Sequence, residues 1–230
     1  MYMSRIALNR RRRGGMKLLS SRHAMHAAVM SSFTPGTQTE SESGRVLWRI
    51  DRHGEEMNLL IVSPERPCLA HIAEQAGWST DNTWVTRDYR PFLESLVIDS
   101  EFIFRLVANP TRRMSSMSAG DGDSRKQIVG HRTVGHQRQW LLDRSSDWGF
   151  TVVDSLVEDI PEKELRICER DTVTFRRGSG RVTLVTAAFE GKLAVTEPDR
   201  LRNSLSHGIG RAKGYGCGLL TLLPVGSSAP

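Results

Sequence analysis

The sequence is poor in cysteine, and its few cysteines lie far apart. Cys68, Cys168 and Cys217 are odd in number and form no CxxC pair, so neither a disulfide framework nor a zinc site is indicated. We expect all three to be small core residues of a protein in a reducing compartment. The cysteine content therefore favours a cytoplasmic protein.

Long hydrophobic runs are also missing. No apolar stretch approaches the roughly 18 residues that a membrane helix needs. The basic N-terminus continues into Leu18-Leu19 and then into polar residues, without the apolar core of a signal peptide. We therefore expect no membrane partner.

Several catalytic and cofactor motifs are absent as well. No GxSxG motif and no Cys-His pairing stands out, so acyl transfer has no support. The acidic run 121–123 lacks the other ligands of a metal loop. The glycine-rich run 207–222 follows a helix and precedes a strand, and Gly214 stands where a P-loop has Ser or Thr. A dinucleotide fold carries its glycines after the first strand, not at the far end of the chain. We expect neither ATP nor NAD, and no cofactor or metal ion.

Positive charge is what the sequence has in excess. It carries 32 Lys and Arg against 26 Asp and Glu, a formal net charge of +6 at pH 7. Such an excess indicates either a polyanionic partner or a solvated basic surface. Three clusters lie in the second half: a basic insertion (Arg112, Arg113, Arg125, Lys126, Arg132), a hairpin tip (Arg176, Arg177, Arg181) and a glycine-rich loop (Gly208, Gly210, Arg211, Lys213, Gly214).

Together the three clusters favour recognition of phosphates. Guanidinium groups at a hairpin tip can enter a groove or hold phosphates. Glycines let backbone N–H groups approach a phosphate closely, although a glycine-rich turn by itself is more often only a tight connection. No aromatic pattern for stacking single-stranded bases is visible. The pattern therefore predicts an RNA partner recognised by its shape and phosphates, such as a hairpin.

Hydrophobic periodicity predicts the same order of elements in both halves of the chain. In the first half, Ser20 or Ser21 caps the first helix. The expected elements there are strand 2–8, a basic loop at 11–13, a helix through Met30, strands 46–50 and 57–63, helix 69–76 and strand 84–89. In the second half they are strand 102–108, helix 137–145, strand 150–156, hairpin 168–176 and 181–189 extended at 193–195, helix 198–206 and strand 219–223.

This order is that of the ferredoxin-like unit. We therefore predict an α+β protein of two tandem ferredoxin-like (RRM-like) β-α-β-β-α-β domains, residues 1–95 and 96–230. The second domain contains the basic insertion 111–133, in which the run 120–123 is expected to be mobile.

Two histidines on the first helix are the best candidates for chemistry. His23 and His26 are three residues apart and share one helix face. Because histidine titrates near neutrality, one ring can act as a general base while the other acts as a general acid. Such a pair suits metal-free RNA cleavage, in which a 2′-OH loses a proton and the leaving 5′ oxygen gains one. The same spacing is also common on partly exposed helices, and no third ligand for a metal ion lies nearby.

Four motifs, in order along the chain, match a known family. They are the opening strand Tyr2–Arg5, Met25-His26 on the first helix, the run Phe104–Pro110, and the run Phe189–Leu193 followed by Gly208–Leu220. In these motifs the chain resembles the CasE family, the CRISPR-associated endoribonucleases of type I-E systems. The resemblance covers nearly the whole chain.

The resemblance implies two tandem ferredoxin-like domains and metal-independent cleavage of CRISPR precursor RNA at the base of each repeat hairpin, leaving a 2′,3′-cyclic phosphate. It also implies that the enzyme keeps its product and becomes a subunit of the Cascade complex. His26 corresponds to the family's catalytic His, whereas His23 stands where the family usually has Tyr. The hairpin 176–181 corresponds to the family's groove-binding hairpin, and the loop 208–218 to its glycine-rich loop.

Three functions stay open on the sequence. The first is an endoribonuclease in which His26 acts as general base or acid and His23 assists. The second, favoured by the missing Tyr, is a non-catalytic RNA-hairpin-binding subunit of the same complex. The third is a structural subunit without RNA contacts, against which the basic clusters argue.

Overall fold

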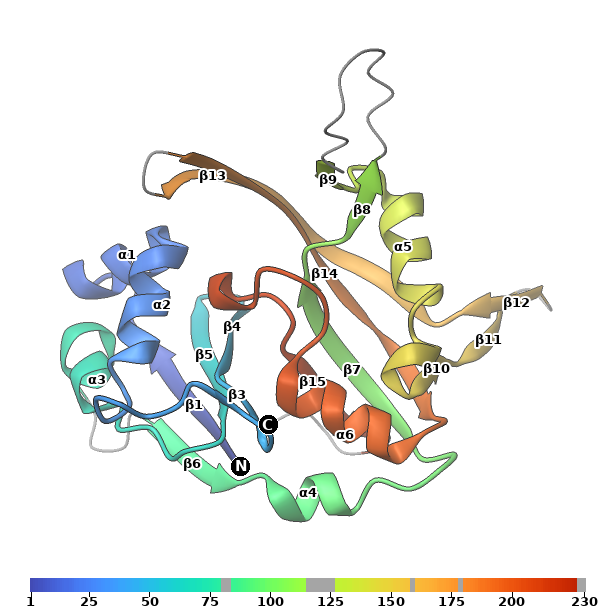
Figure 1. Ribbon diagram of the computed structural model, residues 1–230, viewed down its shortest axis with the longest axis horizontal. Coiled ribbons are helices and arrows are strands. Elements are labelled where there is room, and N and C mark those ends of the chain that lie inside the picture. The colour runs from blue at the N-terminus through green and yellow to red at the C-terminus, as the bar shows by residue number, and fades with distance from the viewer. Residues whose placement is uncertain (80–83, 115–126, 158–159, 178–179, 227–230) are drawn as a thin grey trace, which may run out of the picture.

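A computed structural model describes residues 1–79, 84–114, 127–157, 160–177 and 180–226, so the run 120–123 lies outside the described residues. Figure 1 shows two sheets, one from each half of the chain. Both follow the ferredoxin-like strand order, which confirms the predicted α+β class. The first sheet uses residues from 2 to 88 and the second from 101 to 224. The domain boundary between residues 95 and 96 stays a prediction.

The first sheet is antiparallel, in the order β4-β5-β1-β6. Alternate residues of β1, from Ser4 to Leu8, are buried because one face of the sheet packs against helices, and Ile6 pairs there with Leu59 of β5. Helices α1, α2 and α3 cover this face, with Leu18, Met25 and Ile72 in the shared core. The elements of this half are β1 (Tyr2–Leu8), α1 (Arg13–Ser20), α2 (Arg22–Met30), β2 (Glu40–Ser41), β3 (Gly44–Arg45), β4 (Leu47–His53), β5 (Glu56–Ser63), α3 (Ala70–Ala76), β6 (Trp84–Asp88) and α4 (Arg90–Glu94).

The sequence analysis does not predict helix α1. It assigns Arg13 to a loop, which is wrong, because Arg13 begins this helix. Because glycine disfavours helix formation, the pair Gly14-Gly15 argues against a helix in this segment. Tertiary packing requires these glycines. A Cβ on Gly14 would stand 2.2 Å from the carbonyl oxygen of Gln75, and one on Gly15 would stand 2.0 Å from that of Asn9.

The second sheet has the order β10-β14-β7-β15, and β13 also pairs with β14. Strands β13 and β14 form a hairpin longer than predicted, because β14 continues without a break to Val195. Helices α5 and α6 bury Trp140 and Leu201 against Phe104 and Phe189 of the sheet. The elements are β7 (Glu101–Ala108), β8 (Thr111–Met114), β9 (Gln127–Gly130), α5 (Val134–Leu142), the 3-10 helix η1 (Ser146–Trp148), β10 (Phe150–Val152), β11 (Asp154–Val157), β12 (Ile160–Lys163), β13 (Leu165–Arg177), β14 (Gly180–Val195), α6 (Pro198–His207), the 3-10 helix η2 (Lys213–Tyr215) and β15 (Leu220–Pro224).

Two further details correct the sequence prediction. The expected strand 150–156 is two strands, of which β10 pairs with β14 and β11 with β12. Cys68 and Cys168 are exposed, so only Cys217 is the expected core residue; all three are free thiols. Cys168 lies at an irregularity of the β13–β14 register, between Ile167 and Glu169, and such a bulge re-aims a side chain.

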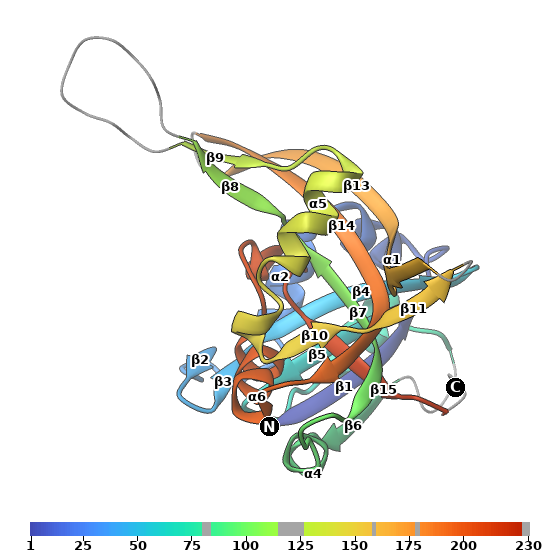
Figure 2. The ribbon, with the colours of Figure 1, turned by 90° about the vertical axis from the view of Figure 1, so that its right-hand side faces the viewer.

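A buried ion-pair network joins the two halves. Arg49 of β4 is 1% exposed and donates to both carboxylate oxygens of Asp51, at 2.6 and 2.7 Å. Its Nη1 donates to the carbonyl oxygens of Arg105 and Leu219, each at 2.8 Å, and the Arg105 guanidinium reaches Asp51 at 3.1 Å. Figure 2 shows β4 and β7 close together near the middle of the molecule. This network therefore joins β4 of the first sheet to β7 and β15 of the second.

Candidate active site

Helix α2 positions the two candidate histidines. The Ser21 side chain caps the helix by accepting a hydrogen bond from the Ala24 N–H at 3.2 Å, as predicted. Met25 and Val29 are buried in the core, so the face that carries His23 and His26 turns outward. His23 is exposed and His26 is half-buried.

The loop between α6 and β15 covers the ring of His26. A Cβ added to Gly214 would lie 3.4 Å from Cε1 of His26 and 3.6 Å from its Nε2. The Nδ1 atom of His26 is buried and has no hydrogen-bond partner among the described residues. Burial lowers the pKa of His26 below 6.5, and the nearby His23 and Arg45 lower it further. The ring is therefore neutral at neutral pH and able to accept a proton.

Glycine is required where this loop turns. Gly208 ends α6 with φ 77°, and its Cβ would stand 2.7 Å from Leu47. Gly216 has φ 79°, and its Cβ would stand 2.8 Å from the Trp48 ring. At its base the loop is closed by Gly218, whose carbonyl accepts from Ile209 N–H at 2.9 Å. The glycines thus let the loop pack on β4 while its tip reaches α2.

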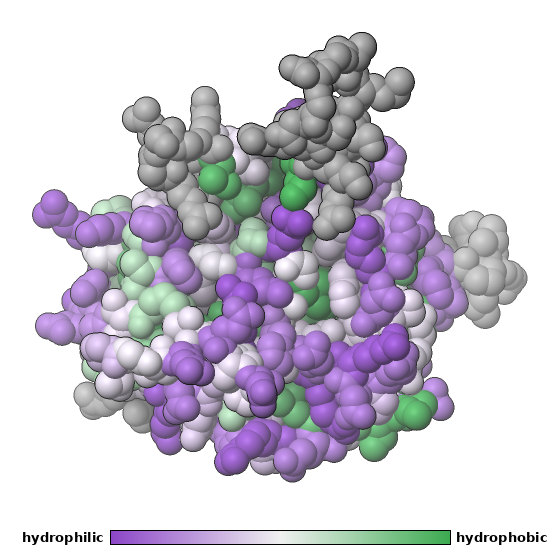
Figure 3. Space-filling model, in the orientation of Figure 1, coloured by the Kyte–Doolittle hydropathy of each residue, from purple (hydrophilic) through white to green (hydrophobic). Residues whose placement is uncertain are grey.

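Two cations of the loop lie close to this site. Lys213 is half-buried, and burial lowers its pKa, with a further contribution from Arg45. Arg211 is exposed. In Figure 3 this face of the molecule is largely hydrophilic, with scattered hydrophobic patches. Gly210 has φ 73° and stands over Trp140, so it serves the turn more directly than the site.

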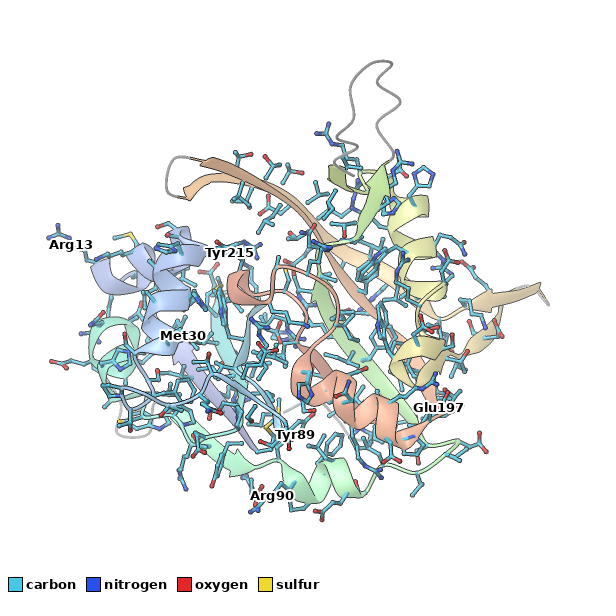
Figure 4. All side chains as sticks on the ribbon, in the orientation of Figure 1. Arg13, Met30, Tyr89, Arg90, Glu197 and Tyr215 are labelled. Carbon is cyan, nitrogen blue, oxygen red and sulfur yellow. The ribbon has the colours of Figure 1, made fainter. Side chains whose placement is uncertain are left out.

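Sequence reasoning missed two arginines. Arg45 of β3 lowers the pKa of both His26 and Lys213 and pairs with Glu40 at 2.9 Å. Arg22 of α2 donates through Nη1 to the Tyr215 carbonyl at 2.8 Å. Figure 4 labels Tyr215 at the tip of the loop, next to α2. No local signal marks their roles at the site, because Arg45 approaches His26, and Arg22 approaches Tyr215, only through the tertiary fold.

A cavity of about 590 Å³ opens beside the helix. Helices α1 and α2, strand β4 and the hairpin β13–β14 form its walls. Arg22 and His23 line it from α2, Arg52 from β4, and Arg170 and Asp171 from β13. His23 and several arginines therefore surround a polar hollow, whereas His26 lies on the same helix beneath the loop and does not line this cavity.

The other predicted residues lie apart from His26. The backbone of Arg176 and Arg181 pairs at the end of the β13–β14 hairpin, and Arg177 pairs with Gly180. In Figure 1 this hairpin arches toward α1 and α2, whereas β8, β9 and α5 lie on the other side of the molecule. Exposed Arg112, exposed Arg132 and the backbone of Arg113 belong to that side; Arg125 and Lys126 lie outside the described residues.

Within the described ranges, no helix is long and apolar enough to cross a bilayer. Over those same residues, no three His, Cys, Asp or Glu side chains gather as ligands for a metal ion.

The fold and the site define a class: a protein of two ferredoxin-like sheets with a histidine helix beneath a glycine-rich loop. The family model described as "CRISPR associated protein" matches residues 1–224. The chain therefore belongs to the CRISPR associated protein family, which confirms the family resemblance of its motifs.

Individual relatives agree with this assignment. CRISPR-associated endoribonuclease Cse3 of Thermus thermophilus is 25% identical, over 97% of this chain and 100% of its own. The structure of Thermus thermophilus Cse3 bound to an RNA representing a pre-cleavage complex has a TM-score of 0.77 at 23% identity, covering 97% of this chain and 98% of that one. A chain of a CRISPR RNA-guided surveillance complex has a TM-score of 0.64 at 20% identity, covering 98% of this chain and 100% of that one. Both structures share the fold of this chain.

Proposed function

We propose that this protein is an endoribonuclease that cleaves CRISPR precursor RNA at the base of the repeat hairpin. The observation that carries the proposal is the position of His26: a neutral, half-buried ring beneath the loop 208–218, on the helix whose Arg22 and His23 line a cationic hollow. Membership of the CRISPR associated protein family and the endoribonuclease name of the Cse3 relative support the same activity.

In the proposed mechanism His26 acts as the general base. Its neutral ring takes the proton of the 2′-OH, which attacks the adjacent phosphorus and expels the 5′ oxygen of the next nucleotide, leaving a 2′,3′-cyclic phosphate. His23, which is exposed and lines the cavity, protonates the leaving oxygen or orients the phosphate. Lys213 and backbone N–H groups of the loop stabilise the charge on the phosphate. The reaction needs no metal ion.

The RNA stem lies, in this proposal, along the hairpin β13–β14. Its terminal arginines (Arg176, Arg177, Arg181) enter the groove or hold the phosphates, as guanidinium groups on a narrow hairpin can. The loop residues Arg211 and Lys213 hold the strand near the scissile phosphate. The insertion (Arg112, Arg113, Arg125, Lys126, Arg132) contacts a more distant part of the RNA, because its described part lies on the other side of the molecule.

We further propose that the protein keeps its product and works as a subunit of a surveillance complex in the cytoplasm. The similarity to a chain of a CRISPR RNA-guided surveillance complex supports the partner. The three free thiols suit a reducing compartment.

The test is cleavage of repeat RNA in EDTA. We expect cleavage to proceed, and His26→Ala to lower its single-turnover rate constant by about 100-fold or more, since a general base contributes on that order. A 2′-deoxy substitution at the cleavage site should abolish cutting while RNA binding persists. A requirement for added metal, or full activity of His26→Ala, would refute the mechanism.

The second candidate is a non-catalytic RNA-hairpin-binding subunit of the same complex. It is favoured by His23, which stands at the position where the resembling family usually has Tyr. Stoichiometric binding of repeat RNA with no cut product, in EDTA and with added Mg²⁺ alike, would select this candidate.

A further inference from the structure

The tip of the loop 208–218 reaches across to the first half of the molecule. Its base is attached to the second half, because the Gly218 N–H donates to the Val107 carbonyl at 2.7 Å. Its tip, the 3-10 helix η2, instead packs against α2, where Gly214 faces the His26 ring. The covering of His26 therefore depends on contacts between two elements that are distant in the chain.

Arg22 provides the directed contact between these elements. It lies one turn before His26 on α2, and its Nη1 donates to the Tyr215 carbonyl at 2.8 Å. Its Nη2 lies 3.9 Å from Asp171 of β13, and its side chain is 26% exposed. One guanidinium thus joins α2 to the loop and points a second nitrogen toward the hairpin. Such a fork suits two partners at once, which a lysine ammonium does not reproduce.

We propose that Arg22 is a positioning residue, which holds the loop 208–218 over His26 and thereby sets the geometry and environment of that ring. The expected effect of Arg22 on cleavage rests on the proposed function. The contact itself, and its effect on the His26 environment, exist whether or not the chain cuts RNA.

Loss of the Arg22 contact has a defined effect on His26. Burial is the largest cause of the lowered pKa of His26, and Gly214 of the loop lies against this ring. The charged groups that act on the ring are His23 on α2 and Arg45 on β3, and η2, which packs against α2, carries Lys213 and Tyr215. Arg22 is not among the charges that lower this pKa directly. A change in the titration of His26 on mutation of Arg22 therefore reports movement of the loop.

The experiment measures two quantities for Arg22→Ala. We expect the NMR titration of His26, without RNA, to shift toward 6.5, its ordinary value. We also expect the single-turnover rate constant at saturating protein to fall about 10- to 100-fold, since small displacements of a reacting group cost that much. Circular dichroism verifies that the variant is folded.

Arg12→Ala is the matched control. Arg12 also donates one guanidinium hydrogen bond to a backbone carbonyl, that of Gly77 at 3.0 Å, but between α1 and α3 and away from the loop. The control removes the same charge and the same kind of bond. We expect it to leave the His26 titration and the cleavage rate constant unchanged. Equal effects of the two variants would overturn the proposal.

Arg22→Lys separates positioning from simple attraction to RNA, and serves if Arg22→Ala does not fold. Lysine keeps the charge, so RNA affinity should stay near that of the wild type, while the rate constant stays lowered and the His26 titration stays shifted. Full recovery of the rate constant and of the titration would show that only the charge matters. If no variant or wild-type protein cuts RNA, the titration still decides the role of Arg22, and only the proposed function fails.

Discussion

At the scale of single residues, the proposed chemistry depends on how His26 is buried. An exposed imidazole is half-protonated close to 6.5, whereas burial beneath Gly214 disfavours the charged form. His23, only three residues away, is exposed. Two rings of the same type on one helix face therefore have different environments, which is the condition for one to act as base and the other as acid.

The lowered pKa of His26 predicts the pH dependence of cleavage. A general base acts only when neutral, so the single-turnover rate constant should fall as the pH drops through the folded-state pKa, with a midpoint below 6.5. Rate constants measured from pH 4.5 to 8, at saturating protein and constant ionic strength, test this. A midpoint above 6.5 would contradict it.

The same pKa has a consequence for stability. Between the folded-state pKa and 6.5, the unfolded chain binds more protons at position 26 than the folded chain does, so stability rises with pH in this window. The loss of folding stability caused by protonation of His26 is complete below the folded-state pKa and absent above 6.5. In urea unfolding, His26→Gln should show a shallower rise in the free energy of unfolding than the wild type.

At the scale of elements, the loop 208–218 uses its glycines for two purposes. Gly216 has a left-handed backbone and presses on Trp48, so its role is in the fold. Gly214 is not left-handed, and the space beside it opens toward His26. One glycine therefore shapes the loop, and in the proposed mechanism the other leaves this edge of the His26 ring open to the substrate.

Alanine at these two positions should give opposite results. Gly216→Ala should lower the free energy of unfolding by about 1–3 kcal/mol, from backbone strain and the clash with Trp48. Gly214→Ala should stay within about 1 kcal/mol of the wild type, because its Cβ meets the ring at 3.4 Å, an ordinary contact. It should nevertheless slow cleavage about tenfold by occupying the space of the scissile phosphate.

Urea unfolding and single-turnover cleavage measure both effects. A Gly214→Ala variant with normal cleavage would mean that substrate does not approach this side of the ring. A Gly216→Ala variant as stable as the wild type would mean that the loop readily moves off Trp48.

At the scale of the whole molecule, the site exists only between the two halves. Helix α2 belongs to the first half, whereas the loop and the hairpin belong to the second. Leu47 and Val62 of the first sheet also belong to the core of the second. The buried network of Arg49, Asp51 and Arg105 fixes the arrangement of the two sheets.

Arg49→Ala should therefore be severe. The substitution removes one of the two arginines that pair with the buried Asp51 carboxylate. Breaking a buried ion pair costs about 3–5 kcal/mol of stability. We expect a lower urea midpoint and slower cleavage, measured on the same preparation. Arg10→Ala, which removes an exposed pair with Glu55, is the control and should change stability by less than about 1 kcal/mol. Equal midpoints for the two variants would contradict the proposed role of the network.

Much of the fold could be predicted from the sequence because its signals are local. Alternating apolar residues marked the strands, and Ser21 marked the start of α2 by capping it. The repeated β-α-β-β-α-β order then followed from the order of these elements. Helix α1 could not be predicted in this way, because the reason for Gly14 and Gly15 lies in the neighbouring segments that they contact.

The sequence by itself determined the two sheets, the outward face of α2 and its pair of histidines, since periodicity and spacing are properties of the chain. Only the tertiary structure decided which loop covers His26 and which arginines, Arg22 and Arg45, lie beside it. The physical reason is burial. The pKa of an imidazole and the value of a guanidinium hydrogen bond depend on what surrounds them, and here the surroundings come from the opposite half of the chain.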